Sequence, residues 1–348
     1  MVPSPPSATL EIVCDESGFA GGNLVGPGHS PVFAHASLTV SAERAATLIA
    51  ALRTHSRPRP GEFKAARLTQ SQQAAAATWL LSQSEMTADC ALVHLTDTRF
   101  FVLARTVDVL LGDRPVSGID SPGATPELRR AAVALYRASR RSREEGRWDR
   151  FLVAAANLLR TNNRWLPPDP LPRFAASVEG VLATEPEPEV ASVLGRLHAA
   201  GFRAAEARAA LGRDRRAAPL MEPLLPALMC AIQAWGARTD SLTVVHDEQS
   251  ALTPWRIAEM GARLAVEPSS GHLDALRRVD SREDPRVQVA DLLAGLGRRW
   301  AAATLANRTD AADLGGTRPI SPDLELGPRL RPLVDPRSVW VEPMRSDP

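Results

Sequence analysis

Apolar and polar positions near the start of the chain show the patterns that are typical of β-strands. Residues 11–15 form an apolar run that ends in an acid, and residues 32–40 alternate and carry β-branched side chains. A Gly/Pro-rich stretch over 19–31 separates them, so we expect two strands that pair as a hairpin. Residues 16–18 (Glu-Ser-Gly) are expected to break the first strand, and residues 90–95 predict a further strand.

Helical spacing appears between these strands. Ser41 is a good N-cap for a helix over 42–55. Thr69 and Gln72 form a capping-box pattern that predicts a second helix over 70–84.

The stretch from Phe100 to Arg238 has a different pattern. It is rich in Ala, Arg and Leu at helical spacing and is interrupted by proline clusters. Thr125 followed by Pro126 is typical of a helix start. We expect a helical insertion here.

Strand character returns at residues 242–246. A helix over 254–264, a short strand ending near Val279 and a helix over 285–303 follow. The chain after Asn307 is Pro-rich, and we expect a mostly irregular tail that can wrap around the domain. The pattern predicts an α/β fold in which the helical insertion divides one core domain. The expected divisions are a first core part at 1–99, the insertion at 100–238, a second core part at 239–306 and a C-terminal tail at 307–348.

Composition narrows the class of protein. The 348 residues are 44% hydrophobic, which is enough for a substantial core. No apolar run approaches the roughly 18 residues that span a bilayer, and the start lacks a signal-peptide pattern. The three cysteines are far apart and show no metal-binding spacing, so we expect reduced thiols and a cytoplasmic protein without membrane contact.

The charge of the chain is almost balanced, at a net +1. Nucleic-acid binding would therefore depend on local patches rather than on bulk charge. The Arg-rich stretches 137–150 and 203–216 are either such patches or solvated helix faces. Lys64 is the only lysine in the chain.

Two predicted strands end in aspartate. Asp15 follows the first apolar run, and Asp247 follows residues 242–246. A buried, unpaired carboxylate costs several kcal/mol, so each is solvated, paired or bound to a cation. If the strands are neighbours, both carboxylates lie at one edge of the sheet.

Asp291 lies in the last predicted helix, beside its apolar stripe. Its neighbours at i+3 and i+4 are Ala294 and Gly295, which would let the helix approach another element closely. Glu62 follows a proline-rich break and stands two residues before Lys64. By pattern alone Glu62 is an ordinary loop acid.

Three motifs together resemble a known family. They are Asp15-Glu-Ser-Gly18, Glu62-x-Lys64 and Gln288-Val-Ala-Asp291-Leu-Leu-Ala-Gly295. They resemble the motifs of the bacterial and phage domain-of-unknown-function family numbered 3800, which is grouped with the ribonuclease H-like superfamily. The resemblance covers roughly residues 10–96 and 240–303. It implies a ribonuclease H-like mixed sheet flanked by helices, and an acidic metal site made of Asp15, Glu62, Asp247 and Asp291.

Such a set of acids suits one chemistry in particular. Mg²⁺ or Mn²⁺ prefers carboxylate oxygens, and two such ions can activate a water and stabilise the leaving oxygen in phosphodiester cleavage. We therefore expect a metal-dependent nuclease or related hydrolase acting on DNA or RNA, with Lys64 neutralising the site or contacting the phosphate. The alternative is a non-catalytic ribonuclease H-like binding module in a defence or mobile-element assembly, with the helical insertion as the surface that binds the protein partner.

The sequence offers two acids for the last place in the site. Asp97, after the strand over 90–95, competes with Asp247 for the last place in the site. Asp97 lies between two threonines and is interpreted as a turn residue. Asp247 continues its apolar run, so we expect it to point to the same face as Val245 and away from His246. Asp284, directly before Pro285, is expected to cap the last helix.

Overall fold

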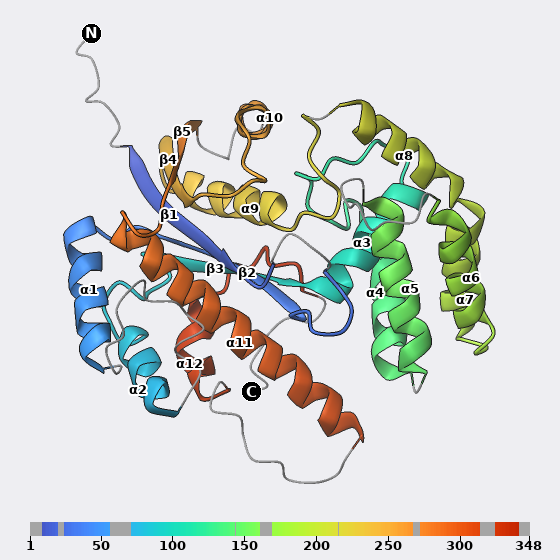
Figure 1. Cartoon of the computed structure of the whole chain (residues 1–348), viewed down its shortest axis with the longest axis horizontal. Helices are drawn as coiled ribbons and strands as arrows, with labels where there is room; N and C mark the ends of the chain where they lie inside the picture. Colours follow the sequence, from blue (N-terminus) through green and yellow to red (C-terminus); the bar gives the residue numbers. More distant parts are fainter. Residues whose placement is uncertain are drawn as a thin grey trace.

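A five-stranded mixed sheet forms the centre of the molecule. The computed structural model describes residues 9–19, 24–55, 71–142, 144–160, 169–214, 216–266, 272–313 and 324–340. The strand order is β3-β2-β1-β4-β5, and helices cover both faces of the sheet (Figure 1). The chain is an α/β protein, as the alternation of strand and helix patterns predicted.

The first strand lies in the middle of this sheet. The strands are β1 (Leu10–Ser17), β2 (Val32–Leu38), β3 (Ala91–Asp97), β4 (Ser241–Asp247) and β5 (His272–Val279). β2 pairs antiparallel with β1 on one side and with β3 on the other. The pairing of β1 with β2 confirms the predicted hairpin. β4 returns from the second half of the chain and pairs parallel with the other side of β1, and β5 pairs parallel with β4. The C-terminal ends of β1 and β4 therefore lie side by side.

Alternation along β1 sends its side chains to two different layers. Val13 packs with Val245 and with Val287 of the long helix α11 (Pro285–Asp313). Ile12 and Cys14 instead pack in the cluster that contains α9 (Leu224–Gly236). We call these the α11 face and the α9 face of the sheet.

The α11 face is covered mainly by α1 (Ala42–His55), α2 (Ser71–Leu80) and α11. The Ser41 hydroxyl accepts a hydrogen bond from the Arg44 N–H at 3.2 Å, so Ser41 caps α1 as predicted. α11 comes very close to β3 at Gly297, where an added Cβ would lie 2.7 Å from Val93 Cγ1. Small size at position 297 is thus what permits the close packing of helix and sheet.

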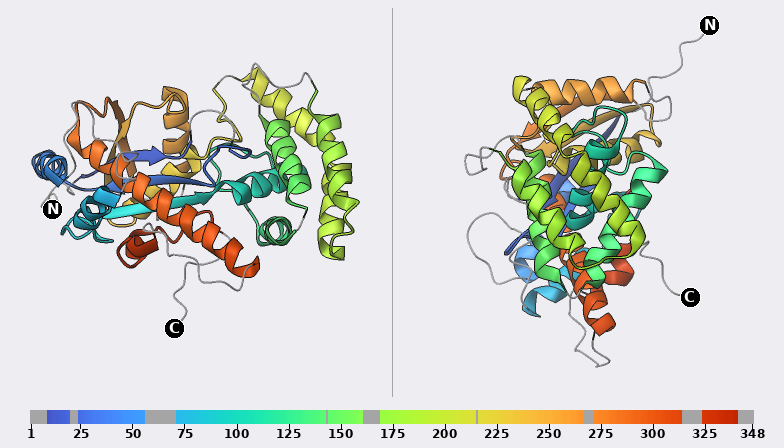
Figure 2. Two further views of the ribbon diagram at one scale, coloured as in Figure 1. Left: turned by 60° about the horizontal axis from the view of Figure 1, so that its bottom comes forward. Right: turned by 90° about the vertical axis from the view of Figure 1, so that its right-hand side faces the viewer.

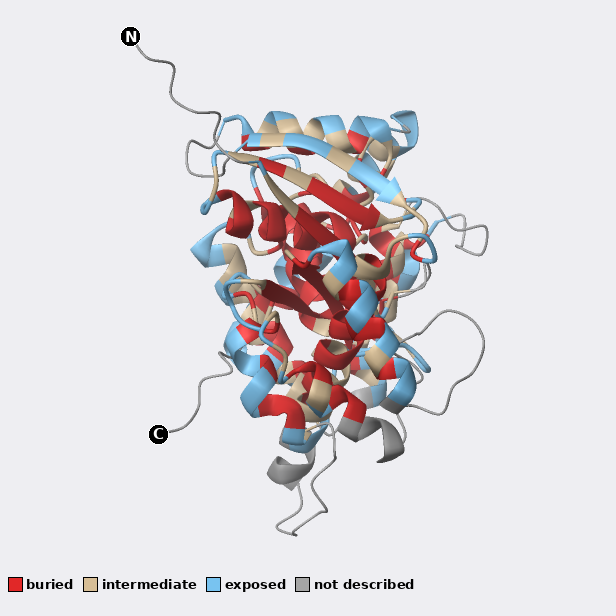
Figure 3. Cartoon of the chain, turned by 90° about the vertical axis from the view of Figure 1, so that its left-hand side faces the viewer, coloured by how far each residue is buried: buried red, intermediate tan, exposed pale blue. Residues whose placement is uncertain are grey.

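The α9 face is covered by α9 and α10 (Pro254–Leu264). Trp235 of α9 donates a hydrogen bond from its indole N–H to the Ser37 hydroxyl of β2, at 2.8 Å. α9 belongs to the stretch predicted as a helical insertion, but it packs on the sheet. Buried positions run through the central strands, whereas β5 and the outer side of α10 are exposed (Figure 3).

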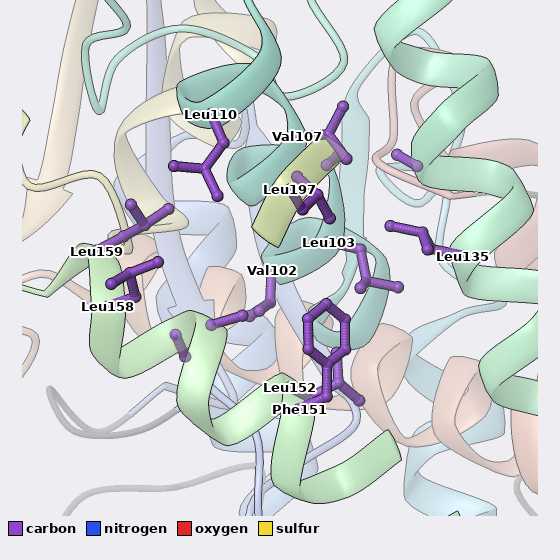
Figure 4. Packing of buried hydrophobic residues seen from close by; sticks show 14 of the residues in the cluster. Val102, Leu103, Val107, Leu110, Leu135, Phe151, Leu152, Leu158, Leu159 and Leu197 are labelled. Atoms are coloured by element: carbon purple, nitrogen blue, oxygen red, sulfur yellow. The ribbon is translucent and has the colours of Figure 1, made fainter. Parts of the chain in front are cut away.

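Helices α3 to α8 form a group at one end of the sheet (Figure 2). They are α3 (Thr98–Leu111), α4 (Pro126–Arg141), α5 (Glu145–Leu159), α6 (Leu171–Leu182), α7 (Pro188–Ala199) and α8 (Phe202–Arg213). Their shared hydrophobic cluster surrounds α3, with Val102, Leu103 and Val107 lying among side chains of α4, α5 and α7 (Figure 4). The predicted cap at Thr125 is confirmed, since its hydroxyl accepts the Leu128 N–H at 3.2 Å.

The C-terminal segment runs along the outer edge of β3. It contains the short turns η2 (Leu324–Leu326), α12 (Gly327–Leu330) and η3 (Arg331–Leu333). The Asp335 N–H donates to the Val93 carbonyl at 2.9 Å, and the Asp97 N–H donates to the Val339 carbonyl at 3.0 Å. Over residues 324–340 the tail therefore wraps along an edge of the sheet, as the sequence interpretation expected.

Some predicted boundaries were wrong. β1 continues through Glu16 and Ser17, because they pair with His35 and Ala34 of β2, and this long-range pairing overrides the local turn signal. α11 continues to Asp313 instead of ending at 303, and α2 ends at Leu80 instead of 84. Thr69 of the expected capping box lies outside the described residues. No helix in the described part of the chain is long and apolar enough to cross a membrane.

Candidate functional site

Three acids selected from the sequence meet near the C-terminal end of β1. Asp15 lies on β1, Asp247 ends the neighbouring parallel strand β4, and Asp291 lies in the second turn of α11, which packs on both strands. The negative charges of Asp247 and Asp291 both act on the Asp15 carboxyl. Two distant parts of the chain thus supply one group of carboxylates on the α11 face.

Asp15 is strongly perturbed in this setting. Its residue surface is 5% exposed, and burial raises the pKa of its carboxyl well above the usual range. The charges of Glu16, Asp291 and Asp247 raise that pKa further, while a 2.7 Å hydrogen bond from the Glu16 N–H lowers it. Like charges held together away from water favour uptake of a proton or a cation.

Glu16 is a fourth acid that the sequence interpretation missed. Burial, then the charges of Asp247 and Glu222, raise the pKa of Glu16 to about 8, although a hydrogen bond with Asp15 acts in the opposite sense. Its Oε2 atom is buried and has no hydrogen-bond partner among the described residues. The Glu-Ser-Gly sequence was interpreted as a strand break. Two adjacent acids at the end of an apolar run were the available signal.

Glu222 is a fifth acid close to this group. It lies just before α9, and burial raises the pKa of its carboxyl to about 7, against the opposing effects of the Leu224 N–H and the charge of Arg256. Nothing in its local sequence marks Glu222, because its position depends on how α9 packs on the sheet.

Asp247 is held by the loop that precedes α11. Its Oδ1 accepts a hydrogen bond from the Ser281 N–H at 3.1 Å. Asp284 accepts from the Arg286 N–H at 2.9 Å, which bears out the predicted cap at the start of α11. The backbone that carries Asp291 is thus anchored at its N-terminal end, next to Asp247.

Asp97 has a structural role instead. It ends β3, which is separated from β1 by β2, and its Oδ1 accepts the Phe100 N–H at 3.1 Å to cap α3. Its Oδ2 accepts the Tyr136 hydroxyl at 2.5 Å. The interpretation of residues 96–98 as a turn was wrong, because β3 leads directly into α3. Asp97 does not join the group around Asp15.

His246 points to the opposite face from Asp247, as the alternation predicted. It is fully buried, and burial lowers the pKa of its imidazole to about 4, despite a hydrogen bond to the Asp247 carbonyl. Its Nδ1 lies 3.0 Å from that carbonyl oxygen, and its Nε2 lies 3.3 Å from Nε2 of His35. The neutral imidazole therefore holds the Asp247 carbonyl group in place from the opposite face of the sheet.

The small residues near Asp291 lie on the buried side of α11. Ala294 and Gly295 are both buried. The close approach of α11 to the sheet that small residues were expected to allow is found at Gly297, two residues after Gly295, where an added Cβ would lie 2.7 Å from Val93 Cγ1.

Two predicted members of the site, Glu62 and Lys64, lie outside the described residues. Within the part of the chain that the structure describes, no three His, Cys, Asp or Glu side chains already form a complete metal site. The chemistry of the donors nevertheless suits a hard divalent cation, since Asp15, Asp247 and Asp291 offer carboxylate oxygens whose charges oppose one another.

Comparisons with known proteins add no assignment. No family model, curated protein or solved structure matches the chain significantly. The geometry and electrostatics of the site are therefore the basis for assigning a function.

Proposed function

We propose that the protein is a divalent-metal-dependent nuclease, or a related phosphodiester hydrolase, of ribonuclease H-like fold. The observation that carries this proposal is the mutual electrostatic action of Asp15, Asp247 and Asp291, which come from two neighbouring strands and the helix packed on them. A protein gains nothing for its stability from such a group alone, because buried like charges repel. Acids in this arrangement are typical of sites that hold cations.

Asp15, Asp247 and Asp291 would hold Mg²⁺ or Mn²⁺, together with Glu62 if the motif resemblance applies. The bound ion supplies charge neutralisation at a phosphate and lowers the pKa of a coordinated water. The chain's own contribution is placement. The Ser281 N–H fixes Asp247, and the Glu16 N–H fixes Asp15. Lys64, two residues after Glu62, is the side chain we assign to the phosphate.

The arrangement of the sheet supports the resemblance to the ribonuclease H-like superfamily. The strand that carries the first acid is central, its parallel neighbour carries the second, and the last long helix carries the third. The helices α3 to α8 form their own core and are the part we propose as the insertion. The three cysteines are all unpaired, which supports the cytoplasmic setting.

A cleavage assay tests the proposed function. Purified protein is incubated with labelled DNA and RNA, single- and double-stranded, in Mg²⁺, in Mn²⁺ or in chelator. We expect cleavage of at least one substrate that chelator removes and that Asp15→Asn abolishes. Asp97→Asn is the matched control, since Asp97 is buried but lies outside the site. Metal-dependent binding without cleavage would instead support the non-catalytic module.

A further inference from the structure

Two buried histidines face each other on the α9 face, behind the acid group. His35 of β2 and His246 of β4 flank β1, and they are 1% and 0% exposed. Their Nε2 atoms lie 3.3 Å apart, and their rings stack with centroids 5.3 Å apart at 25°. Neither residue belongs to the set that the proposed nuclease site uses.

The proton on His246 can be assigned from its neighbours. Its Nδ1 lies 3.0 Å from the Asp247 carbonyl oxygen, which is only an acceptor, so Nδ1 carries the proton and donates it. In the neutral ring Nε2 is then a bare lone pair. An imidazole held by a backbone carbonyl in this way is in the form that ligates metal ions.

Glu16 adds an oxygen to this pair. In the register of the sheet Glu16 lies directly opposite His35, and its Oε2 atom is 3.7 Å from His246 Nε2. The Glu16 side chain is 10% exposed, and Oε2 has no hydrogen-bond partner among the residues described. The bare nitrogen and the Glu16 oxygen therefore lie 3.7 Å apart, and either a proton on Glu16 or a cation can lie between them.

The spacing of these atoms matches a tetrahedral ion. Two donors bound to Zn²⁺ at 2.0–2.1 Å lie about 3.3 Å apart when the geometry is tetrahedral. The Nε2 atoms of His35 and His246 are already at this distance, whereas Glu16 Oε2 is 3.7 Å from His246 Nε2 and must move closer to bind the same ion. Accordingly, no three-residue metal site is complete among the described residues. We propose that His35, His246 and Glu16 form a second cation site, which takes a zinc-type transition-metal ion.

This site differs in its donor atoms from the group of Asp15, Asp247 and Asp291, although Glu16 is hydrogen-bonded to Asp15. Two imidazole nitrogens and one carboxylate favour Zn²⁺ or a similar ion over Mg²⁺, which prefers oxygen alone. The competing arrangement is a simple N–H···N hydrogen bond from His35 to His246. That bond satisfies His246 but leaves the Glu16 oxygen without a partner. The proposal does not rest on the nuclease function.

Cobalt(II) is the probe, because its visible absorption reports tetrahedral nitrogen and oxygen ligands. The full chain is freed of metal with chelator and titrated with Co²⁺. We expect one equivalent to give a tetrahedral spectrum, and His35→Gln and His246→Gln each to weaken that binding at least tenfold. His94→Gln is the matched control, since His94 is also buried on the α9 face but contacts Asp335, and it should keep the spectrum. Asp291→Asn should keep it too, which separates this site from the acid group.

A measurement on the wild type tests the same proposal without depending on whether the variants fold. X-ray absorption of the Co²⁺-loaded wild type should show scattering from two imidazole rings. Absence of a tetrahedral spectrum, a metal shell without imidazole, or an unchanged spectrum in folded His35→Gln would each overturn the proposal.

Discussion

A carboxylate that is buried among others of the same charge destabilises the metal-free protein. Asp15 is in that position, because burial and the charges of Glu16, Asp291 and Asp247 all raise its pKa. Asparagine has nearly the same shape but no charge. We expect Asp15→Asn to raise the free energy of unfolding in chelator by about 1–3 kcal/mol at pH 8, where the repulsion is largest. Denaturant unfolding measures this, and a variant less stable than wild type would show that Asp15 has a structural partner.

The contrast between Asp97 and Asp247 gives a second test at the level of residues. Asp97→Ala removes the cap of α3 and leaves the Tyr136 hydroxyl without its acceptor, so it should lower stability by about 2–4 kcal/mol. Its affinity for Mn²⁺ should stay within a few-fold of wild type. Asp247→Ala should instead weaken Mn²⁺ binding about tenfold or more. Calorimetry compares the two, and the reverse ranking would remove Asp247 from the site.

At the level of elements, the contact between α11 and the sheet determines where Asp291 lies. An added Cβ at Gly297 would be 2.7 Å from Val93 Cγ1, whereas one at Gly195, an exposed position of α7, would meet nothing within 4 Å. Gly297→Ala should therefore lower stability by about 1–3 kcal/mol through overpacking. Gly195→Ala should raise it by up to about 1 kcal/mol through helix propensity. Thermal unfolding of the pair checks this, and equal effects would mean that α11 does not approach β3 closely.

The elements also show how far the sequence alone leads. The apolar runs before Asp15 and Asp247 and the stripe beside Asp291 are local patterns, so the strands and helix that carry these acids could be predicted. Glu16 and Glu222 could not, because their burial depends on pairing with β2 and on the packing of α9. The placement of α9 on the sheet, rather than with α3 to α8, also depends on contacts that no local pattern encodes.

For the whole molecule, the buried acids make stability depend on pH. Glu16 and Glu222 have pKa values raised to about 8 and about 7, so the folded state holds protons that the unfolded state has lost, and stability falls as the pH rises. His246, with a pKa lowered to about 4, has the opposite effect, but only below its ordinary pKa of 6.5. Between pH 6.5 and 8 the acids dominate.

We expect the free energy of unfolding in chelator to fall by about 1–2 kcal/mol from pH 6.5 to 8, since one proton changes it by about 1.4 kcal/mol per pH unit. Glu16→Gln should flatten this decline, because glutamine does not ionise. Urea unfolding at a series of pH values measures the slope. A wild type whose stability rises over this range would show that the acids are already compensated in the folded protein.

Binding of Mn²⁺ to the wild-type chain is the most direct test that Asp15, Asp247 and Asp291 act as one cation site. Titration calorimetry at pH 7 in two buffers of different ionisation enthalpy reports both the affinity and the protons exchanged. We expect Mn²⁺ to bind with release of protons, because the ion replaces protons on carboxyls of raised pKa. Asp15→Asn and Asp291→Asn should each weaken binding about tenfold or more. No Mn²⁺ binding by the folded wild type, or binding that these two substitutions leave unchanged, would contradict the proposed site.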